Sequence, residues 1–138
     1  MAVSDIMSKN PVHIGPKASV FAAINLLNQM DVRHLPVVEN GELKGIISDR
    51  DLKAFSASEL EQAQLAQSNF DLSLRLKQAV SDIMDGNVFF VNPESPINEV
   101  IDIMLDQKIG AVPVVDLDNT LVGIVSYVDI LKQAATKL

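Results

Sequence analysis

Two short strings in the sequence combine a hydroxyl and a carboxylate at the same spacing. Ser48 stands three residues before Asp51, and Ser126 stands three residues before Asp129. Each serine follows a strand-like apolar run and opens a helix-like segment, where four backbone N–H groups lack intrahelical partners. Those N–H groups and the helix dipole attract an anion, and the aspartate can accept hydrogen bonds from two vicinal hydroxyls. The chemistry open to these strings is therefore recognition of an anion or of paired hydroxyls.

A structural role explains the same strings. Ser-x-x-Asp is close to a capping box, in which the serine and the acidic side chain satisfy each other's backbone N–H groups and nothing else is required. Taken alone, each string fits the cap better than a ligand site. The two roles are compatible in different ligand states, so both interpretations stay open at this point.

The remaining residue types argue against catalysis. The chain has two His and no Cys, which excludes disulfides, thiolate metal sites and cysteine nucleophiles. It has no Gly-rich loop of the Walker type and no His-Glu-x-x-His string, and neither Ser48 nor Ser126 has a neighbouring base placed as a nucleophile needs. We therefore predict that the protein is not an enzyme, has no metal site of its own and requires no cofactor, while whether a metal accompanies the phosphate of a ligand stays open.

Composition and charge describe one globular body. Of 138 residues, 48% are hydrophobic, and the net charge is −7, which argues against binding to nucleic acid or to an anionic membrane. Residues 81–138 have 3 basic and 9 acidic residues, whereas residues 1–53 have 6 of each. The N-terminus has no basic flank before an apolar core, and no apolar run approaches the roughly 20 residues that span a bilayer. We expect a cytoplasmic protein.

The sequence contains an internal duplication. Ser4–Met7 recurs as Ser81–Met84 at an offset of 77 residues, and the same offset pairs Pro36–Val38 with Pro113–Val115. After one additional residue, an offset of 78 continues the match, pairing Leu43 with Leu121, Gly45 with Gly123, Ser48 with Ser126 and Asp51 with Asp129. A copy of about fifty residues is too small to bury a sufficient core alone. The two copies are therefore expected to pack on each other.

Each copy is predicted to form a strand, a helix, a hairpin and a second helix. Val12–Ile14 and Phe89–Val91 are short β-rich runs, each closed by a proline. Helical spacing of apolar residues predicts a helix over Ser19–Met30. In the second copy Ser95 is the expected N-cap and Pro96 the first helical residue, followed by the apolar positions Ile97, Val100, Ile101, Met104 and Leu105.

A tight turn and a polar connector complete the predicted organisation. Asn40 and Gly41 supply the positive φ angles of a hairpin turn between two β-rich runs. The segment between the copies is rich in Ala, Gln, Ser and Leu and has weak helical periodicity, so a helical connector is favoured over a binding role. The predicted boundaries are 1–57 for the first repeat, 58–80 for the connector and 81–138 for the second repeat.

The sequence resembles a tandem pair of CBS domains, modules named after cystathionine β-synthase. The resemblance spans nearly all of the chain except the connector. It implies an α+β fold of two β-α-β-β-α repeats that pack through their sheets about a pseudo-twofold axis. It also implies clefts that bind adenine nucleotides or S-adenosylmethionine, and a homodimer. Three strings carry it in both copies: Asp5-Ile6-Met7 with Asp82-Ile83-Met84, Leu35-Pro36-Val37-Val38 with Val112-Pro113-Val114-Val115, and Gly45–Asp51 with Gly123–Asp129.

The same resemblance assigns residues to two clefts. Asp51 and Asp129 would hold ribose hydroxyls, and Ser48 and Ser126 would face phosphate. Tyr127 would stack on a base or lie on the dimer surface. The first predicted cleft comprises Arg33, His34, Ser48, Arg50, Asp51, Ser95, Val100, Ile109 and Gly110. The second predicted cleft comprises Ala18, Ala23, Val32, Arg33, Ser126, Tyr127 and Asp129.

The two copies differ in charge where the resemblance places a ligand phosphate. The first copy has Arg33 and His34 just before the hairpin proline, and the second has Gly110 and Ala111. Each charge-assisted hydrogen bond to a phosphate contributes about 1.5–3 kcal/mol. We therefore predict that the cleft with Asp51 binds a nucleotide phosphate more tightly than the other cleft. Arg33 could instead pair with a neighbouring aspartate on a solvated face, where such pairs contribute little.

Two functions follow from these observations. The leading hypothesis is a regulatory module that senses AMP, ADP, ATP or S-adenosylmethionine and acts on a regulated protein that the sequence does not identify. The alternative is a structural module whose paired helices form a dimer interface and whose clefts are empty. Melting temperatures measured with a panel of adenosyl compounds would separate the two hypotheses, because a ligand that binds the folded protein raises its melting temperature.

Overall fold

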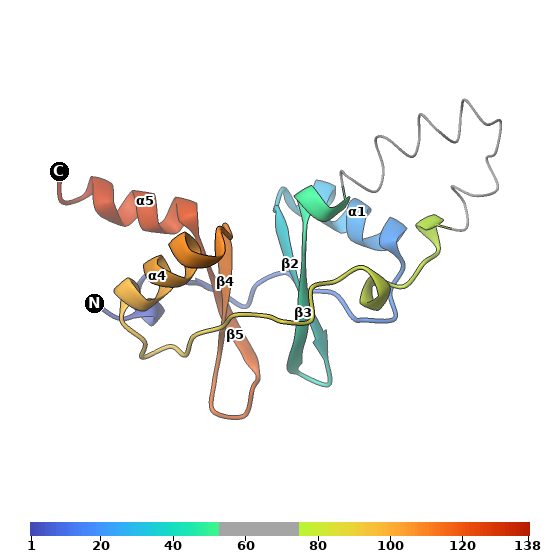
Figure 1. The fold of residues 1–138 in the computed structure, drawn as a ribbon, viewed down its shortest axis with the longest axis horizontal. Helices are drawn as coiled ribbons and strands as arrows, with labels where there is room; N and C mark the ends of the chain where they lie inside the picture. The colour runs from blue at the N-terminus through green and yellow to red at the C-terminus, as the bar shows by residue number, and fades with distance from the viewer. Residues whose placement is uncertain (53–74) are drawn as a thin grey trace. The chain divides into compact units, whose positions relative to one another are not determined.

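The computed structural model describes residues 1–52 and 75–138, which have the mixed helix and strand content of an α+β fold, as predicted (Figure 1). The chain divides into two compact units. The first-repeat unit comprises Val12–Glu39 and Lys44–Gly86, and the second-repeat unit comprises Met1–Pro11, Asn40–Leu43 and Asn87–Leu138. No helix in the described residues is both long and apolar enough to cross a membrane.

The first-repeat unit contains helix α1 (Val20–Met30), strand β2 (His34–Glu39) and strand β3 (Glu42–Ser48) from Lys44 onward, and β2 and β3 pair in a two-stranded sheet. The helix predicted over Ser19–Met30 is confirmed, and the Ser19 side chain caps it by accepting a hydrogen bond from the Ala22 N–H at 3.0 Å. At the hairpin turn Asn40 and Gly41 have φ angles of 53° and 82°. The predicted tight turn is confirmed, because both residues have the positive φ angles that this kind of turn requires.

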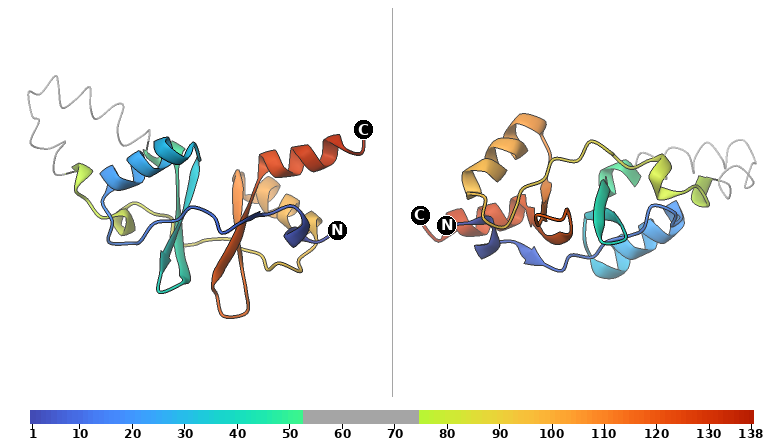
Figure 2. Two further views of the ribbon diagram at one scale, coloured as in Figure 1. Left: turned by 180° about the vertical axis from the view of Figure 1, so that it is seen from behind. Right: turned by 90° about the horizontal axis from the view of Figure 1, so that it is seen from below.

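The second-repeat unit repeats this plan with helix α4 (Ile97–Gln107), strands β4 (Ala111–Val115) and β5 (Leu121–Ser126), and helix α5 (Tyr127–Ala135). Strand β5 lies in the middle of a three-stranded sheet, between β4 and the short strand β1 (Ser8–Lys9). All strand pairs in this sheet are antiparallel. In the views of Figures 1 and 2, α4 and α5 lie beside the β4–β5 hairpin.

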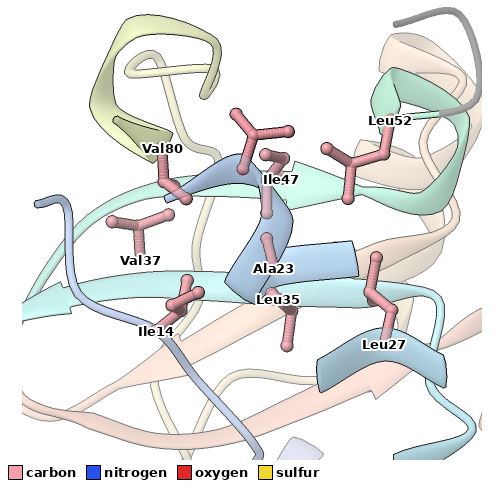
Figure 3. Packing of buried hydrophobic residues seen from close by; sticks show 9 residues of the cluster. Ile14, Ala23, Leu27, Leu35, Val37, Ile47, Leu52 and Val80 are labelled. Carbon is pink, nitrogen blue, oxygen red and sulfur yellow. The ribbon is translucent and has the colours of Figure 1, made fainter. Parts of the chain in front are cut away.

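Each unit has its own apolar core, and each core includes the opening turn of the other repeat. Val80, in the 3-10 turn η2 (Val80–Asp82), is fully buried in the first-repeat core (Figure 3). Val3, in the equivalent turn η1 (Val3–Asp5), is fully buried among the second-repeat residues. The first core comprises Ile14, Val20, Ala23, Leu27, Leu35, Val37, Ile47, Leu52 and Val80. The second core comprises Val3, Val91, Val100, Val112, Val114 and Val125.

The Asp-Ile-Met strings have a packing role that pairs them with the hairpin glycines. A Cβ atom on Gly45 would lie 2.5 Å from the Met84 Sδ, and a Cβ atom on Gly123 would lie 2.5 Å from the Met7 Sδ. The methionine of one repeat's opening string therefore occupies the space beside the other repeat's glycine. This contact explains why the two strings recur together in each copy.

Two local predictions are wrong. The expected strands Val12–Ile14 and Phe89–Val91 are reduced to single parallel bridges, Ile14 with Val37 and Val91 with Val114, because each run pairs at only one residue. Pro96, not Ser95, is the N-cap of α4, and the cap has no side-chain hydrogen bond. The Ser95 hydroxyl instead accepts a hydrogen bond from the Asn92 N–H at 3.1 Å. Most of the predicted connector lies outside the described residues, and the predicted repeat boundaries remain predictions.

Candidate functional site

The Ser48–Asp51 string forms the corner between β3 and a helical segment at residues 49–52. The Asp51 Oδ2 accepts a hydrogen bond from the Ser48 N–H at 3.0 Å, and the Ser48 Oγ accepts one from the Asp51 N–H at 3.2 Å. These reciprocal bonds are the capping box that the spacing predicts. The cap uses only one carboxylate oxygen, and the Asp51 side chain is exposed.

A backbone hydrogen bond holds the start of β2 against this first corner. The Asp49 N–H donates to the Arg33 carbonyl oxygen at 2.7 Å. Arg33 and Arg50 are exposed, and His34 is half-buried. The structure thus places Arg33 and His34 beside the corner within the first-repeat unit, and their role in a ligand cleft stays a prediction.

His34 has an electrostatic environment that its sequence neighbours alone do not reveal. Burial lowers the pKa of the His34 imidazole, and the positive charge of Arg33 lowers it further. The carboxylates of Asp51 and Asp49 act in the opposite direction, but burial is the largest effect and the pKa lies below its ordinary value. His34 is therefore mainly neutral near pH 7, because its unperturbed pKa is already about 6.5.

The second corner, at Ser126 and Asp129, has one more internal hydrogen bond than the first corner. The Asp129 Oδ2 accepts from the Ser126 N–H at 2.8 Å and from the Ser126 Oγ at 3.2 Å. The Ser126 Oγ in turn accepts from the Asp129 N–H at 3.3 Å. The serine hydroxyl here is both donor and acceptor within the corner. In the first corner it acts only as an acceptor among the bonds of the described residues.

The backbone frame of the two corners is the same, but their side chains differ in charge. The Tyr127 N–H donates to the Gly110 carbonyl oxygen at 2.9 Å, as the Asp49 N–H does to Arg33. Gly110 therefore stands where the first corner has a guanidinium group. The second corner thus lacks the cation that Arg33 supplies to the first.

The sequence match to known proteins decides the family. The family model for the CBS domain matches residues 3–58 and again residues 80–136. The chain belongs to the CBS domain family. A CBS domain-containing protein of Dictyostelium discoideum is 35% identical over 131 residues, covering 94% of this chain and 88% of that protein.

Solved structures of CBS domain pairs have the same fold. The CBS domain pair of protein MJ0100, in complex with 5′-methylthioadenosine and S-adenosyl-L-methionine, is 32% identical with a TM-score of 0.79, and covers 100% of this chain and 98% of that one. The protein CBSX2, in complex with AMP, is 28% identical with a TM-score of 0.80, covering 98% and 96%. The predicted tandem CBS pair is confirmed, and such pairs are in general regulatory ligand-binding modules.

Three residues of the predicted ligand clefts are buried in the structure. Val100 and Ala23 have 0% exposed surface and belong to the cores of their own units. Their side chains lie on the apolar faces of α4 and α1, and their contact with a ligand stays a prediction. Ser95 is 5% exposed, with its hydroxyl bonded to Asn92. The partly buried residues Ala18, Val32, Ile109 and Gly110 remain predicted contacts.

Sequence reasoning missed one residue of the first corner. Asp49 donates the backbone bond to Arg33 and its carboxylate acts on His34. The signal was present in the string Ser48-Asp49-Arg50-Asp51, which places two carboxylates within four residues. Its relation to His34 needs the hairpin, because β2 and β3 bring together residues that are fifteen positions apart in the chain.

Proposed function

We propose that this CBS domain pair is a non-catalytic regulatory module that binds an adenosyl compound at its Ser-x-x-Asp corners. The observation that carries the proposal is that only one of the two carboxylate oxygens of each aspartate takes part in the cap. In the described part of the chain, Asp51 and Asp129 bond their corners through Oδ2, and Oδ1 makes no hydrogen bond. A carboxylate oxygen can accept from a ribose hydroxyl while the other oxygen keeps the cap intact. Capping and ligand binding are then compatible in one conformation.

The nature of the ligand is supported by the similar proteins. The pair of MJ0100 is in complex with 5′-methylthioadenosine and S-adenosyl-L-methionine, and CBSX2 is in complex with AMP. All three compounds contain an adenosine-type ribose with vicinal hydroxyls. We therefore propose an adenosyl ligand for this chain, with ribose at the aspartate of each corner and no cofactor required.

The charge difference between the corners supports a preference for phosphate in the first repeat. Arg33 is exposed and its backbone is bonded to the corner, whereas the equivalent residue of the second repeat is Gly110. One charge-assisted hydrogen bond from a guanidinium to a phosphate contributes about 1.5–3 kcal/mol, which is about tenfold or more in affinity. AMP, ADP or ATP should accordingly bind more tightly at the first corner than at the second.

Isothermal titration of AMP tests the proposal with matched variants of the two corners. Asp51→Asn keeps one oxygen that can accept the capping N–H but removes the charge and the second acceptor oxygen. We expect Asp51→Asn and Arg33→Ala to weaken AMP binding at the tighter site by about tenfold or more. The matched variant Asp129→Asn should leave that site within about twofold of the wild-type affinity.

Thermal melts with AMP, ADP, ATP, adenosine and S-adenosylmethionine give a second readout. A ligand at a hundredfold excess over its dissociation constant stabilises the folded protein by about 2.7 kcal/mol. If none of these compounds raised the melting temperature, the sensing function would be wrong and the structural module would be favoured. If Asp129→Asn reduced AMP affinity more than Asp51→Asn, the assignment of phosphate to the first corner would be wrong.

We also propose that the protein is a homodimer formed through α5 and α4. Three apolar side chains of α5 are exposed, with Tyr127 at 45%, Val128 at 41% and Leu131 at 60%. A hollow of about 360 Å³ lies along the same two helices, lined by residues that include Ile97, Ile101, Ile130 and Ala134. Exposed apolar side chains on α5 and a hollow along the same two helices suit a self-complementary twofold contact with a second copy.

A further inference from the structure

His34 is held among three charged groups by the backbone frame of the first corner. The bond between the Asp49 N–H and the Arg33 carbonyl oxygen, at 2.7 Å, fixes the start of β2 beside the corner. Among the described residues, the charges that act on the imidazole are Asp51 and Asp49 from the helical segment after β3, and Arg33 from the residue before β2. The side chain is half-buried. It is therefore partly shielded from solvent and close to both signs of charge.

The surroundings of His34 in the structure favour its neutral form. Burial lowers the imidazole pKa and Arg33 lowers it too, and together they outweigh the two carboxylates. The balance is between opposing effects, so an additional negative charge can reverse it. A nucleotide phosphate beside Arg33 would supply up to two such charges at physiological pH.

We propose that His34 takes up a proton when a phosphate-bearing nucleotide binds beside Arg33, which makes it the residue that distinguishes adenosine phosphates from uncharged adenosyl compounds. This inference rests on the proposed ligand site at the first corner. The protonated imidazole donates from both ring nitrogens and carries a charge that the phosphate stabilises. Adenosine has no negatively charged group, so its binding leaves His34 neutral.

The sign of the resulting pH dependence follows from linkage. The phosphate raises the pKa of His34 in the complex above its value in the free protein, which lies below the ordinary value. Affinity for AMP is then greatest at low pH and falls as pH rises through the interval between the free and the bound pKa. One linked proton changes affinity by at most about tenfold per pH unit.

Titration of AMP and of adenosine between pH 5.5 and pH 8, in roughly half-unit steps, tests the inference on wild type and His34→Gln. The ratio of wild-type to variant affinity removes the titration of the AMP phosphate itself, whose second pKa is about 6. For AMP we expect this ratio to fall by about three- to tenfold per pH unit as pH rises through the interval. For adenosine the ratio should be constant.

The other histidine of the chain provides the matched control, since His34 and His13 are the two histidines in the sequence. His13→Gln should bind AMP with the wild-type pH dependence. Calorimetry in MES and in Bis-Tris, which differ in ionisation enthalpy, should show greater proton uptake on AMP binding for wild type than for His34→Gln. These results would support His34 as the proton acceptor.

Nuclear magnetic resonance of the two imidazole rings in the wild-type protein needs no variant. Saturating AMP should move the titration midpoint of the His34 ring to higher pH, and saturating adenosine should not. If AMP bound tightly while that midpoint and the affinity ratio were unchanged, the inference would be overturned and the ligand site would stand. If neither AMP nor adenosine bound at any pH, the proposed function itself would be overturned.

Discussion

Replacing Gly45 by alanine should destabilise the protein although the change adds only one methyl group. The added Cβ would lie 2.5 Å from the Met84 Sδ, 3.0 Å from the Met84 Cγ and 3.0 Å from the Asp85 carbonyl oxygen. Neither group yields freely: the Met84 side chain packs against the first-repeat core, and the Asp85 carbonyl oxygen accepts the Ile46 N–H at 3.1 Å. Overpacking of this kind typically costs about 1–3 kcal/mol.

The alanine has a smaller opposing effect. Glycine in a strand interior is about 0.5–1 kcal/mol less favourable than alanine, because it loses more backbone freedom on folding. The expected net loss in the free energy of unfolding for Gly45→Ala is therefore about 1–2 kcal/mol. Gly123→Ala should behave alike, since its Cβ would meet the Met7 Sδ at 2.5 Å and the Ser8 carbonyl oxygen at 3.1 Å.

Urea unfolding measures this loss, and Gly86→Ala is the matched control. Gly86 has no atom within 4 Å of an added Cβ and no positive φ, so its substitution should change stability by less than about 0.5 kcal/mol or increase it slightly. In the double variant Gly45→Ala with Met84→Ala, the loss should be smaller than the sum of the single losses by about 0.5–2 kcal/mol. Equal midpoints for Gly45→Ala and Gly86→Ala, with unchanged m-values, would refute the packing argument.

Two further predictions concern other parts of the fold. Lys108, the C-cap of α4, has a φ of 56°. Lys108→Gly should stabilise the protein by about 0.5–1 kcal/mol, because glycine adopts this conformation without the steric cost of a side chain. A melting temperature below that of the wild type would contradict this reasoning. Leu131 is 60% exposed on α5, so Leu131→Lys should convert the proposed dimer to a monomer, as measured by light scattering. The control variant Leu117→Lys changes a fully exposed loop residue and should leave the measured mass unchanged. A wild-type monomer at micromolar concentration, or a Leu131→Lys dimer, would rule out this dimer contact.

Much of the candidate site was predictable because its parts are local. The capping boxes at Ser48–Asp51 and Ser126–Asp129 depend on a four-residue spacing, and both form as the spacing indicates. The charge contrast between Arg33 and Gly110 can also be read directly from the duplicated pattern. What the spacing could not show is that one carboxylate oxygen suffices for the cap, since that depends on the rotamer the corner adopts.

The burial of Val100 and Ala23 in the two cores could not be predicted from the sequence, for a different reason. Helical periodicity shows that such residues lie on one face, but it does not say what that face meets. In the structure both faces are closed by apolar side chains from strands and from the opening turns. An apolar residue on such a face can pack in the core or face a ligand cleft. Which of the two occurs depends on packing partners that are distant in the sequence.

By itself the sequence determined the duplication, the two hairpins, the helices that precede them and the hydroxyl–carboxylate corners, because these follow from spacing, turn chemistry and short-range periodicity. Only the tertiary structure decided that Val80 completes the core of the first-repeat unit and Val3 that of the second. It likewise decided that Met84 and Met7 occupy the space beside Gly45 and Gly123. Such contacts join segments far apart in the chain. The hydrophobic effect favours the burial of any apolar surface, so no local sequence pattern specifies which distant residues pack together.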